Sequence, residues 1–168
     1  VFSDSDYEAV THLSLVPTQL LRLLDSGAPL HRLRAVLVGG GPISSALVER
    51  AIYASVPLHL TYGMTESASQ ICTTDRLLET PTPLHAGQPL PGREVRISEA
   101  GEIQIRGPIL AKKFLGSEGL WEDLADAEGW FSTGDLGAFT AEGNLVIQGR
   151  RDRLIISGGE NIQPELIE

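Results

Sequence analysis

Residues 61–66 read Thr-Tyr-Gly-Met-Thr-Glu and directly follow the short apolar run at 56–60. The run predicts a buried strand, so the hexapeptide stands at a strand end. The tyrosine ring can stack on a base, and the glycine lets the backbone lie close to a ligand. The Thr65 hydroxyl can bond a phosphate oxygen, and the Glu66 carboxylate can hold Mg²⁺. Taken alone, the stretch also fits a plain turn with a solvated glutamate.

The segments before this stretch alternate between strand and helix patterns. Their order is β-α-β-α-β, which is typical of a parallel sheet with covering helices. The strand at 33–38 is almost continuously apolar, which predicts that it is buried on both faces. The expected elements are a strand at 10–16, a helix from Pro17 that Gly27 closes, the strand at 33–38, a helix capped by Ser44 or Ser45, and a strand at 58–62.

The chain changes character after about Thr74, where prolines and glycines mark frequent turns. Alternating residues predict a hairpin over 94–107 that turns near Ala100 and Gly101, and a further strand at 145–148. Residues 118–127 predict a short acidic helix. This second part has the pattern of a small antiparallel barrel or sandwich, so the fold class is α/β followed by a small antiparallel β-barrel.

Composition places the chain among globular proteins. It has 168 residues, 42% of them hydrophobic, and a formal net charge of −9, which argues against nucleic acid and anionic membranes as partners. No apolar run approaches the roughly 18 residues that span a bilayer, and the first residues lack the pattern of a signal peptide. The single cysteine, Cys72, predicts a reducing, cytoplasmic location. Because the sequence begins at Val1, without an initiator Met, we expect a piece of a longer chain.

Three further segments carry residues that suit a nucleotide site. Gly39-Gly40-Gly41-Pro42 joins a strand to a helix, where anions bind, although a tight turn explains it equally well. Asp135 follows Ser-Thr-Gly and could accept hydrogen bonds from a ribose diol or stand in an ordinary β-turn. The basic segment 149–153 could hold phosphate or form a solvated loop. The spacing excludes a Walker loop, a dinucleotide fingerprint and a serine-hydrolase elbow.

The order and spacing of these segments resemble the adenylate-forming superfamily, which includes acyl-CoA synthetases, peptide-synthetase adenylation domains and firefly luciferase. The resemblance covers nearly the whole chain from about Val10 to Glu168. It is carried by Tyr-Gly-Met-Thr-Glu at 62–66, Gly-Trp-Phe-Ser-Thr-Gly-Asp at 129–135, Gly-Arg-Arg-Asp-Arg-Leu-Ile at 149–155 and Gly-Gly-Glu-Asn-Ile-Gln-Pro-Glu at 158–165. It implies three parts: an α/β portion of the large AMP-binding domain at 1–84, a small β-barrel subdomain at 85–149, and a hinge with the start of a lid domain at 150–168.

The resemblance also implies a role for each residue that matches a motif. These roles are an adenine pocket at Gly39, Gly40, Gly41 and Tyr62 with Gly63 beside it, an α-phosphate contact at Thr65, a Mg²⁺ ligand at Glu66, a ribose contact at Asp135, a nucleotide contact at Arg150, a hinge at Asp152 and a CoA path at Ser157, Gly158 and Gly159. Thr65 and Glu66 would be the catalytic pair. The implied reaction joins a small carboxylic acid to CoA through an acyl-adenylate, at the cost of ATP, with Mg²⁺ as the metal.

Within the superfamily, the segments 12–20, 65–70 and 159–164 are most similar to the o-succinylbenzoate–CoA ligases of menaquinone and phylloquinone synthesis. Other acyl-CoA synthetases usually carry Tyr or another residue at the position of Gln163. A polar acyl pocket would suit an acid with a second carboxylate and a keto group. The residues expected in that pocket are His59, Ser67, Ser69 and Gln70.

Two elements of the superfamily have no match in the 168 residues: the phosphate loop rich in Ser, Thr and Gly, and the lysine that assists adenylation. We therefore expect these residues alone to be inactive or nearly so. Three alternatives stay open at this point. The chain could belong to another acyl-CoA synthetase that activates a different acid. The acceptor could be a carrier-protein thiol instead of CoA, or the chain could be a truncated, non-catalytic nucleotide-binding module. A homo-oligomer is compatible with the resemblance, and the sequence does not decide it.

Overall fold

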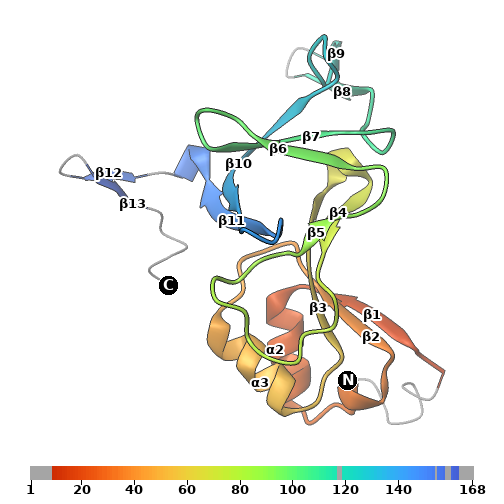
Figure 1. Cartoon of the computed structure of the whole chain (residues 1–168). Coiled ribbons are helices and arrows are strands. Elements are labelled where there is room, and N and C mark those ends of the chain that lie inside the picture. Colours follow the sequence, from red (N-terminus) through yellow and green to blue (C-terminus); the bar gives the residue numbers. More distant parts are fainter. Residues whose placement is uncertain (1–8, 117–118, 154, 158–159, 163–168) are drawn as a thin grey trace.

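A computed structural model describes residues 9–116, 119–153, 155–157 and 160–162. The chain builds a five-stranded sheet of order β1-β2-β3-β4-β5 and a four-stranded sheet of order β11-β10-β7-β6 (Figure 1). The first three strands are parallel, as the β-α-β-α-β pattern predicts, and all the strand pairs that follow them are antiparallel. The chain is therefore a mixed α/β structure in which a parallel sheet with helices precedes an antiparallel sheet.

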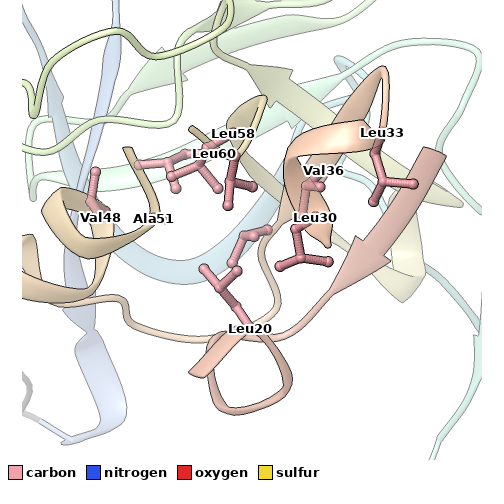
Figure 2. Close-up of a cluster of buried hydrophobic side chains, with 10 residues drawn as sticks. Leu20, Leu30, Leu33, Val36, Val48, Ala51, Leu58 and Leu60 are labelled. Carbon is pink, nitrogen blue, oxygen red and sulfur yellow. The ribbon is translucent and has the colours of Figure 1, made fainter. Parts of the chain in front are cut away.

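One apolar cluster holds the first part together. The helices α2 (Pro17–Asp25) and α3 (Ser45–Tyr53) contribute Leu20 and Val48 to it, and strands β2 (Ala35–Val38) and β3 (Leu58–Met64) contribute Val36 and Leu58. All four side chains are fully buried, and Figure 2 shows them converging between the helices and the sheet. Strand β1 (His12–Leu15) completes the parallel set. Burial of such side chains is the main stabilising term for this half of the chain.

The caps of both helices agree with the sequence prediction. Ser44 accepts a hydrogen bond from the backbone N–H of Leu47, so it satisfies one of the free donors of the first turn of α3. Gly27 follows α2 with φ +70°, the left-handed conformation of a terminating glycine.

The prediction that residues 33–38 are buried on both faces is wrong. In β2 the burial alternates: Val36 and Val38 are buried, whereas Ala35 and Leu37 are partly exposed. The reason is that α2 and α3 pack in one cluster on the same face of the sheet. On the opposite face, Leu37 is partly exposed in the described part of the chain.

Strand β3 runs through Gly63 to Met64 instead of ending at Tyr62. It leads into the single 3₁₀ turn η2 (Thr65–Ser67), and the chain then returns as β4 (Ser69–Thr73), antiparallel to β3. The two-residue strand β5 (Gln88–Pro89) pairs with β4. Neither β4 nor β5 is evident in the sequence pattern, so the residues of the central hexapeptide lie in a strand and a turn of a tight hairpin.

The antiparallel sheet contains the predicted hairpin over 94–107. The hairpin consists of β6 (Glu94–Ile97) and β7 (Glu102–Arg106). The sheet also contains β10 (Phe131–Phe139) and β11 (Leu145–Arg150). The four strands form an open row with β6 and β11 at its edges in the part of the chain that is described. The prediction of a barrel therefore holds only in the coarser form of an antiparallel sheet.

The predicted acidic helix at 118–127 is wrong. Residues 121–123 form β9 (Trp121–Asp123), which pairs with β8 (Lys113–Leu115) in a small separate hairpin. An ion pair between Lys113 and Asp123 joins the two strands. Asp126 then accepts hydrogen bonds from the backbone N–H groups of Glu128 and Trp130. This use of an aspartate side chain favours a turn over a helix.

A second apolar cluster links the two sheets. Tyr62 of β3 and Ile71 and Cys72 of β4 pack with Ile103 and Leu145 from the antiparallel sheet. Strands β4 and β5 thus extend the first sheet, while the buried side chains Ile71 and Cys72 of β4 belong to the second core. The division of the chain at residue 84 stays a prediction.

The last described elements are the 3₁₀ turn η3 (Arg151–Arg153) and the short strands β12 (Ile155–Ser157) and β13 (Glu160–Ile162), which pair with each other. Gly158 and Gly159 of the expected CoA path lie outside the described residues. No helix of the described residues is long and apolar enough to cross a membrane.

Cys72 gives a first testable prediction. Burial raises the pKa of its thiol to about 12, so the folded protein keeps the proton when the unfolded chain, with an ordinary thiol, has lost it. Stability from this group is therefore complete below about pH 9 and is lost as the pH rises from there toward 12. We expect urea denaturation to show a steeper alkaline loss of stability than in Cys72→Ala, by roughly 1 kcal/mol per pH unit. Parallel pH profiles of the two proteins would contradict this.

Candidate active site

A groove of about 530 Å³ opens at the carboxyl ends of the parallel strands, on the sheet face that the helices leave free. It lies between the segment after β1, the glycine turn after β2 and the end of β3. Ligands of parallel α/β sheets bind at this edge. The residues that line it include Val16, Gln19, Gly39, Gly40, Thr61, Gly63, Thr65, Ser69 and Gln70.

Two glycines let the backbones come together beside this groove. A Cβ atom on Gly39 would lie 2.7 Å from the backbone oxygen of Thr61, which is closer than side chains tolerate. Gly40 has φ +74°, in the left-handed region that favours glycine. Gly41 does not line the groove, and a Cβ there would make only an ordinary contact with Pro17. The close backbone approach at Gly39 and the left-handed conformation at Gly40 explain the first two glycines of the run by structure, with or without a ligand.

Tyr62 points away from these glycines. Leu58, Leu60 and Tyr62 occupy the buried face of β3, and Thr61 and Gly63 the groove face. The tyrosine hydroxyl donates a hydrogen bond of 2.6 Å to Oδ2 of Asp135, which comes from β10. Burial, and then this bond, raise the pKa of Tyr62 above its ordinary range. The glycines and the tyrosine that sequence reasoning placed in one adenine pocket therefore lie on opposite faces of β3.

Asp135 stands at the centre of a chain of polar contacts. It is directly opposite Arg150 in the β10–β11 ladder, and Nη1 of Arg150 donates to its Oδ1 at 3.3 Å. The same arginine nitrogen donates to the backbone oxygen of Thr133, and the remaining guanidinium nitrogens reach the Asp152 carboxylate. Hydrogen bonding to Asp152, and then the charge of Asp135, raise the pKa of Arg150. The structure thus brings together four predicted residues: Tyr62, Asp135, Arg150 and Asp152.

Thr65 and Glu66 occupy the 3₁₀ turn that ends the β3–β4 hairpin, with Thr65 on the groove wall. The backbone oxygen of Glu66 accepts a hydrogen bond from Ala111, which ties the turn to the segment after β7. Within the described ranges no group of three His, Cys, Asp or Glu side chains could hold a metal ion. A single carboxylate such as that of Glu66 could hold Mg²⁺, because this ion usually keeps several waters and binds substrate phosphates.

The four residues expected in the acyl pocket divide into two pairs. Ser69 and Gln70 line the groove. Ser67 is buried, and its hydroxyl bonds the backbone of Met64 and Ser69, so it closes the turn instead of facing a ligand. A ring nitrogen of His59 lies 2.9 Å from the backbone oxygen of Thr74, and His59 is not part of the groove lining. Only the first pair is placed where a substrate could touch it.

Sequence reasoning missed Glu102 and Arg151. Glu102 is 5% exposed, and its carboxylate accepts hydrogen bonds from Nη1 of Arg151 at 2.7 Å and from the backbone N–H of Gly134 at 2.8 Å. The only signal in the sequence is a charged residue that begins an otherwise regular alternation at 102–106. The pattern alone places that residue in solvent.

Comparison with known proteins identifies the family. The chain matches the family model described as AMP-binding enzyme over residues 2–115. The chain belongs to the AMP-binding enzyme family. It is 43% identical to the 2-succinylbenzoate–CoA ligase of Salmonella typhimurium over 163 residues, which cover 94% of the chain and 33% of that enzyme.

Two solved structures of the Bacillus subtilis o-succinylbenzoate coenzyme A synthetase are similar to this AMP-binding chain. The complex with AMP superimposes with a TM-score of 0.83 at 37% identity, covering 99% of the chain and 38% of that protein. The complex with ATP and a magnesium ion gives 0.80 at 37% identity, covering 97% and 38%. The chain spans about a third of the length of these relatives. It is homologous to AMP-forming acid–thiol ligases, and it contains part of their fold.

Proposed function

We propose that the protein to which these residues belong is an AMP-forming acid–CoA ligase. A substrate carboxylate attacks the α-phosphorus of ATP, a new O–P bond forms, and pyrophosphate leaves. The thiol of CoA then attacks the acyl carbon, loses its proton, and displaces AMP to give the thioester. The observation that carries the proposal is the position of Thr65, Ser69 and Gln70 in one groove at the sheet edge, in a chain of the AMP-binding enzyme family.

In this proposal, different site residues contact different parts of the nucleotide. The carboxylate of Asp135 accepts hydrogen bonds from the ribose hydroxyls, and Arg150 contacts the nucleotide. The glycine turn at Gly39–Gly41, of which Gly39 and Gly40 line the groove, would lie beside the adenine together with Gly63. Tyr62, on the other face of β3, would act through its hydrogen bond to Asp135. Thr65 donates to the α-phosphate. A fixed hydroxyl beside a group that gathers negative charge stabilises the transition state more than the ground state.

Glu66 would hold the magnesium ion through its carboxylate. When it is bound, the ion neutralises charge on the phosphates and polarises their oxygens. Thr65 and Glu66 are the catalytic residues of this proposal because they would contact the reacting phosphate and its magnesium ion. The finer assignments include a hinge at Asp152 and a CoA path at Ser157, Gly158 and Gly159. The three-part division at residues 84 and 149 also belongs to the proposal.

The acid that we propose is 2-succinylbenzoate. Its two carboxylates and keto group need polar partners, and Ser69 and Gln70, which line the groove, carry a hydroxyl and an amide. The relatives named above are ligases of this acid. The proposed ligase would act in the cytoplasm, and its product would be used in menaquinone synthesis.

The experiment is ATP–pyrophosphate exchange by the protein in its full encoded length, with 2-succinylbenzoate, benzoate and a fatty acid as separate substrates. Exchange driven mainly by 2-succinylbenzoate, followed by thioester formation with CoA, supports the proposal. Exchange with another acid discards the substrate and keeps the chemistry. Thioester formation only on a carrier protein replaces the acceptor. Absence of exchange with every acid, in a preparation that still binds AMP, favours a non-catalytic nucleotide-binding module.

The 168 residues alone should give no exchange above background with any of these acids. The reason is that the phosphate loop and the adenylation lysine of the superfamily have no match among them. Purified chain of this length, assayed beside the full-length protein at equal concentration, tests the point. Turnover by the short chain at a rate near that of the longer one would contradict it.

A further inference from the structure

The strand that carries Asp135 is irregular next to that residue. Between the pairs Ser132–Gln104 and Leu136–Glu102, β10 has three residues where β7 has one. Such a bulge leaves backbone groups without ladder partners and redirects a side chain. Gly134, in the middle of the bulge, has φ +77°. The bulge therefore determines where the Asp135 carboxylate points.

Two side chains replace the missing ladder hydrogen bonds. The Thr133 hydroxyl donates to the backbone oxygen of Ile103 and accepts from the backbone N–H of Asp135. The Glu102 carboxylate accepts the N–H of Gly134 at 2.8 Å. Thr133 and Glu102 are both buried, so these bonds are shielded from competing water. The geometry at Asp135 depends on both of them.

The second oxygen of Glu102 binds another part of the candidate site. Oε2 lies 2.7 Å from Nη1 of Arg151, the residue that follows Arg150 at the end of β11. Arg150 in turn pairs with Asp135. One carboxylate thus contacts both chain segments that meet at Asp135: the bulge of β10 and the end of β11. A buried carboxylate is held in place when a cation and an N–H donor satisfy both of its oxygens.

We propose that Glu102 is a positioning residue for nucleotide binding. Through its contacts with Gly134 and Arg151 it fixes the orientation of the Asp135 carboxylate and the position of the Arg150 side chain. The inference rests on the proposed role of Asp135 as the ribose contact. Glu102 touches no substrate in this proposal, and acts only through these two neighbours. Its removal should therefore change how the protein discriminates between sugars, and not only how stable it is.

The test measures dissociation constants of AMP and of 2′-deoxy-AMP by calorimetry, with full-length protein. Wild type should bind AMP more tightly than 2′-deoxy-AMP. In Glu102→Ala the AMP constant should rise about tenfold, and the preference for AMP should shrink toward one. Glu102→Gln keeps an acceptor for Gly134 and should shift the AMP constant only about threefold.

Thr74→Val is the matched control for stability. Thr74 is buried, and its hydroxyl accepts the N–H of Leu60 in the first sheet, so the variant loses one buried hydrogen bond far along the chain from the bulge. It should lower the midpoint of thermal unfolding and leave both dissociation constants unchanged. If Glu102→Ala does not fold, the test rests on Glu102→Gln and its expected threefold rise in the dissociation constant of AMP.

Unchanged AMP affinity and unchanged sugar preference in the Glu102 variants would overturn the inference. So would an equal loss of preference in Thr74→Val, because general loosening would then explain the effect. Asp135→Asn separates this failure from that of the proposed function. If wild type and Asp135→Asn show the same sugar preference, Asp135 is not the ribose contact and the proposed role falls. If Asp135→Asn loses the preference and the Glu102 variants keep it, only the positioning role is wrong.

Discussion

Replacing Asp135 with alanine should raise the dissociation constant of AMP about a hundredfold. The variant would lose the two charge-assisted hydrogen bonds between the carboxylate and the ribose, each worth about 1.5–3 kcal/mol. Water that bonds the ribose hydroxyls instead would offset part of this loss. The variant also leaves the Tyr62 hydroxyl and the Arg150 guanidinium without the acceptor that both use in the structure. The expected loss corresponds to about 2.7 kcal/mol of binding free energy.

Asp123→Asn is the matched control for this change. Asp123 is an exposed carboxylate on β9 that pairs with Lys113, so its neutralisation changes the net charge without touching the candidate site. Exposed ion pairs of this kind contribute about 0–1 kcal/mol. Calorimetric titration of both variants with AMP should give a large shift for Asp135→Ala and none for Asp123→Asn. Equal constants for the two variants would remove Asp135 from the binding site.

Replacing Gly63 with alanine should destabilise the fold by about 3 kcal/mol or more. Gly63 pairs with Gln70 across the β3–β4 hairpin. A Cβ atom there would overlap the backbone oxygen of Ser69, and would lie 2.6 Å from its carbonyl carbon and 2.9 Å from Cα of Gln70. All three are backbone atoms, so relief requires the hairpin to open. Because Ser69 and Gln70 line the groove, the substrate site should be lost together with stability.

Urea denaturation of Gly63→Ala beside Gly41→Ala measures this effect. A Cβ on Gly41 would make only a 3.9 Å contact with Pro17, and Gly41 has an ordinary φ. The control should therefore stay within about 0.5 kcal/mol of wild type. A Gly63→Ala protein as stable as the control would mean that the two strands are not as close as the structure places them.

The sequence was sufficient to predict the parts whose local chemistry and periodicity agree. The helix from Pro17 to Gly27, the Ser44 cap and the hairpin over 94–107 each depend on one capping or turn residue and on a clear pattern. Strand β4 was missed because positive φ at Ala68 and Ser69 and a bulge beside Gly63 interrupt the pattern that would reveal it. Residues 121–123 were misassigned because acidic residues suit both helix surfaces and short exposed strands.

The site shows the same limit at the level of single side chains. Period-two alternation from Leu58 already places Tyr62 on the buried face and Gly63 on the groove face, so the separation of the adenine-pocket residues was available from the pattern. The position of Glu102 was not. It is buried because a bulge in a distant strand needs an acceptor and because Arg151 supplies a cation, and neither partner is near it in sequence.

A structure of the full-length protein with AMP bound would show directly whether Asp135 holds the ribose. We expect both ribose hydroxyls to lie within hydrogen-bond distance of the Asp135 carboxylate, the α-phosphate to contact Thr65, and the adenine to lie beside the turn at Gly39–Gly41. AMP bound elsewhere, or a ribose that does not reach Asp135, would contradict this expectation.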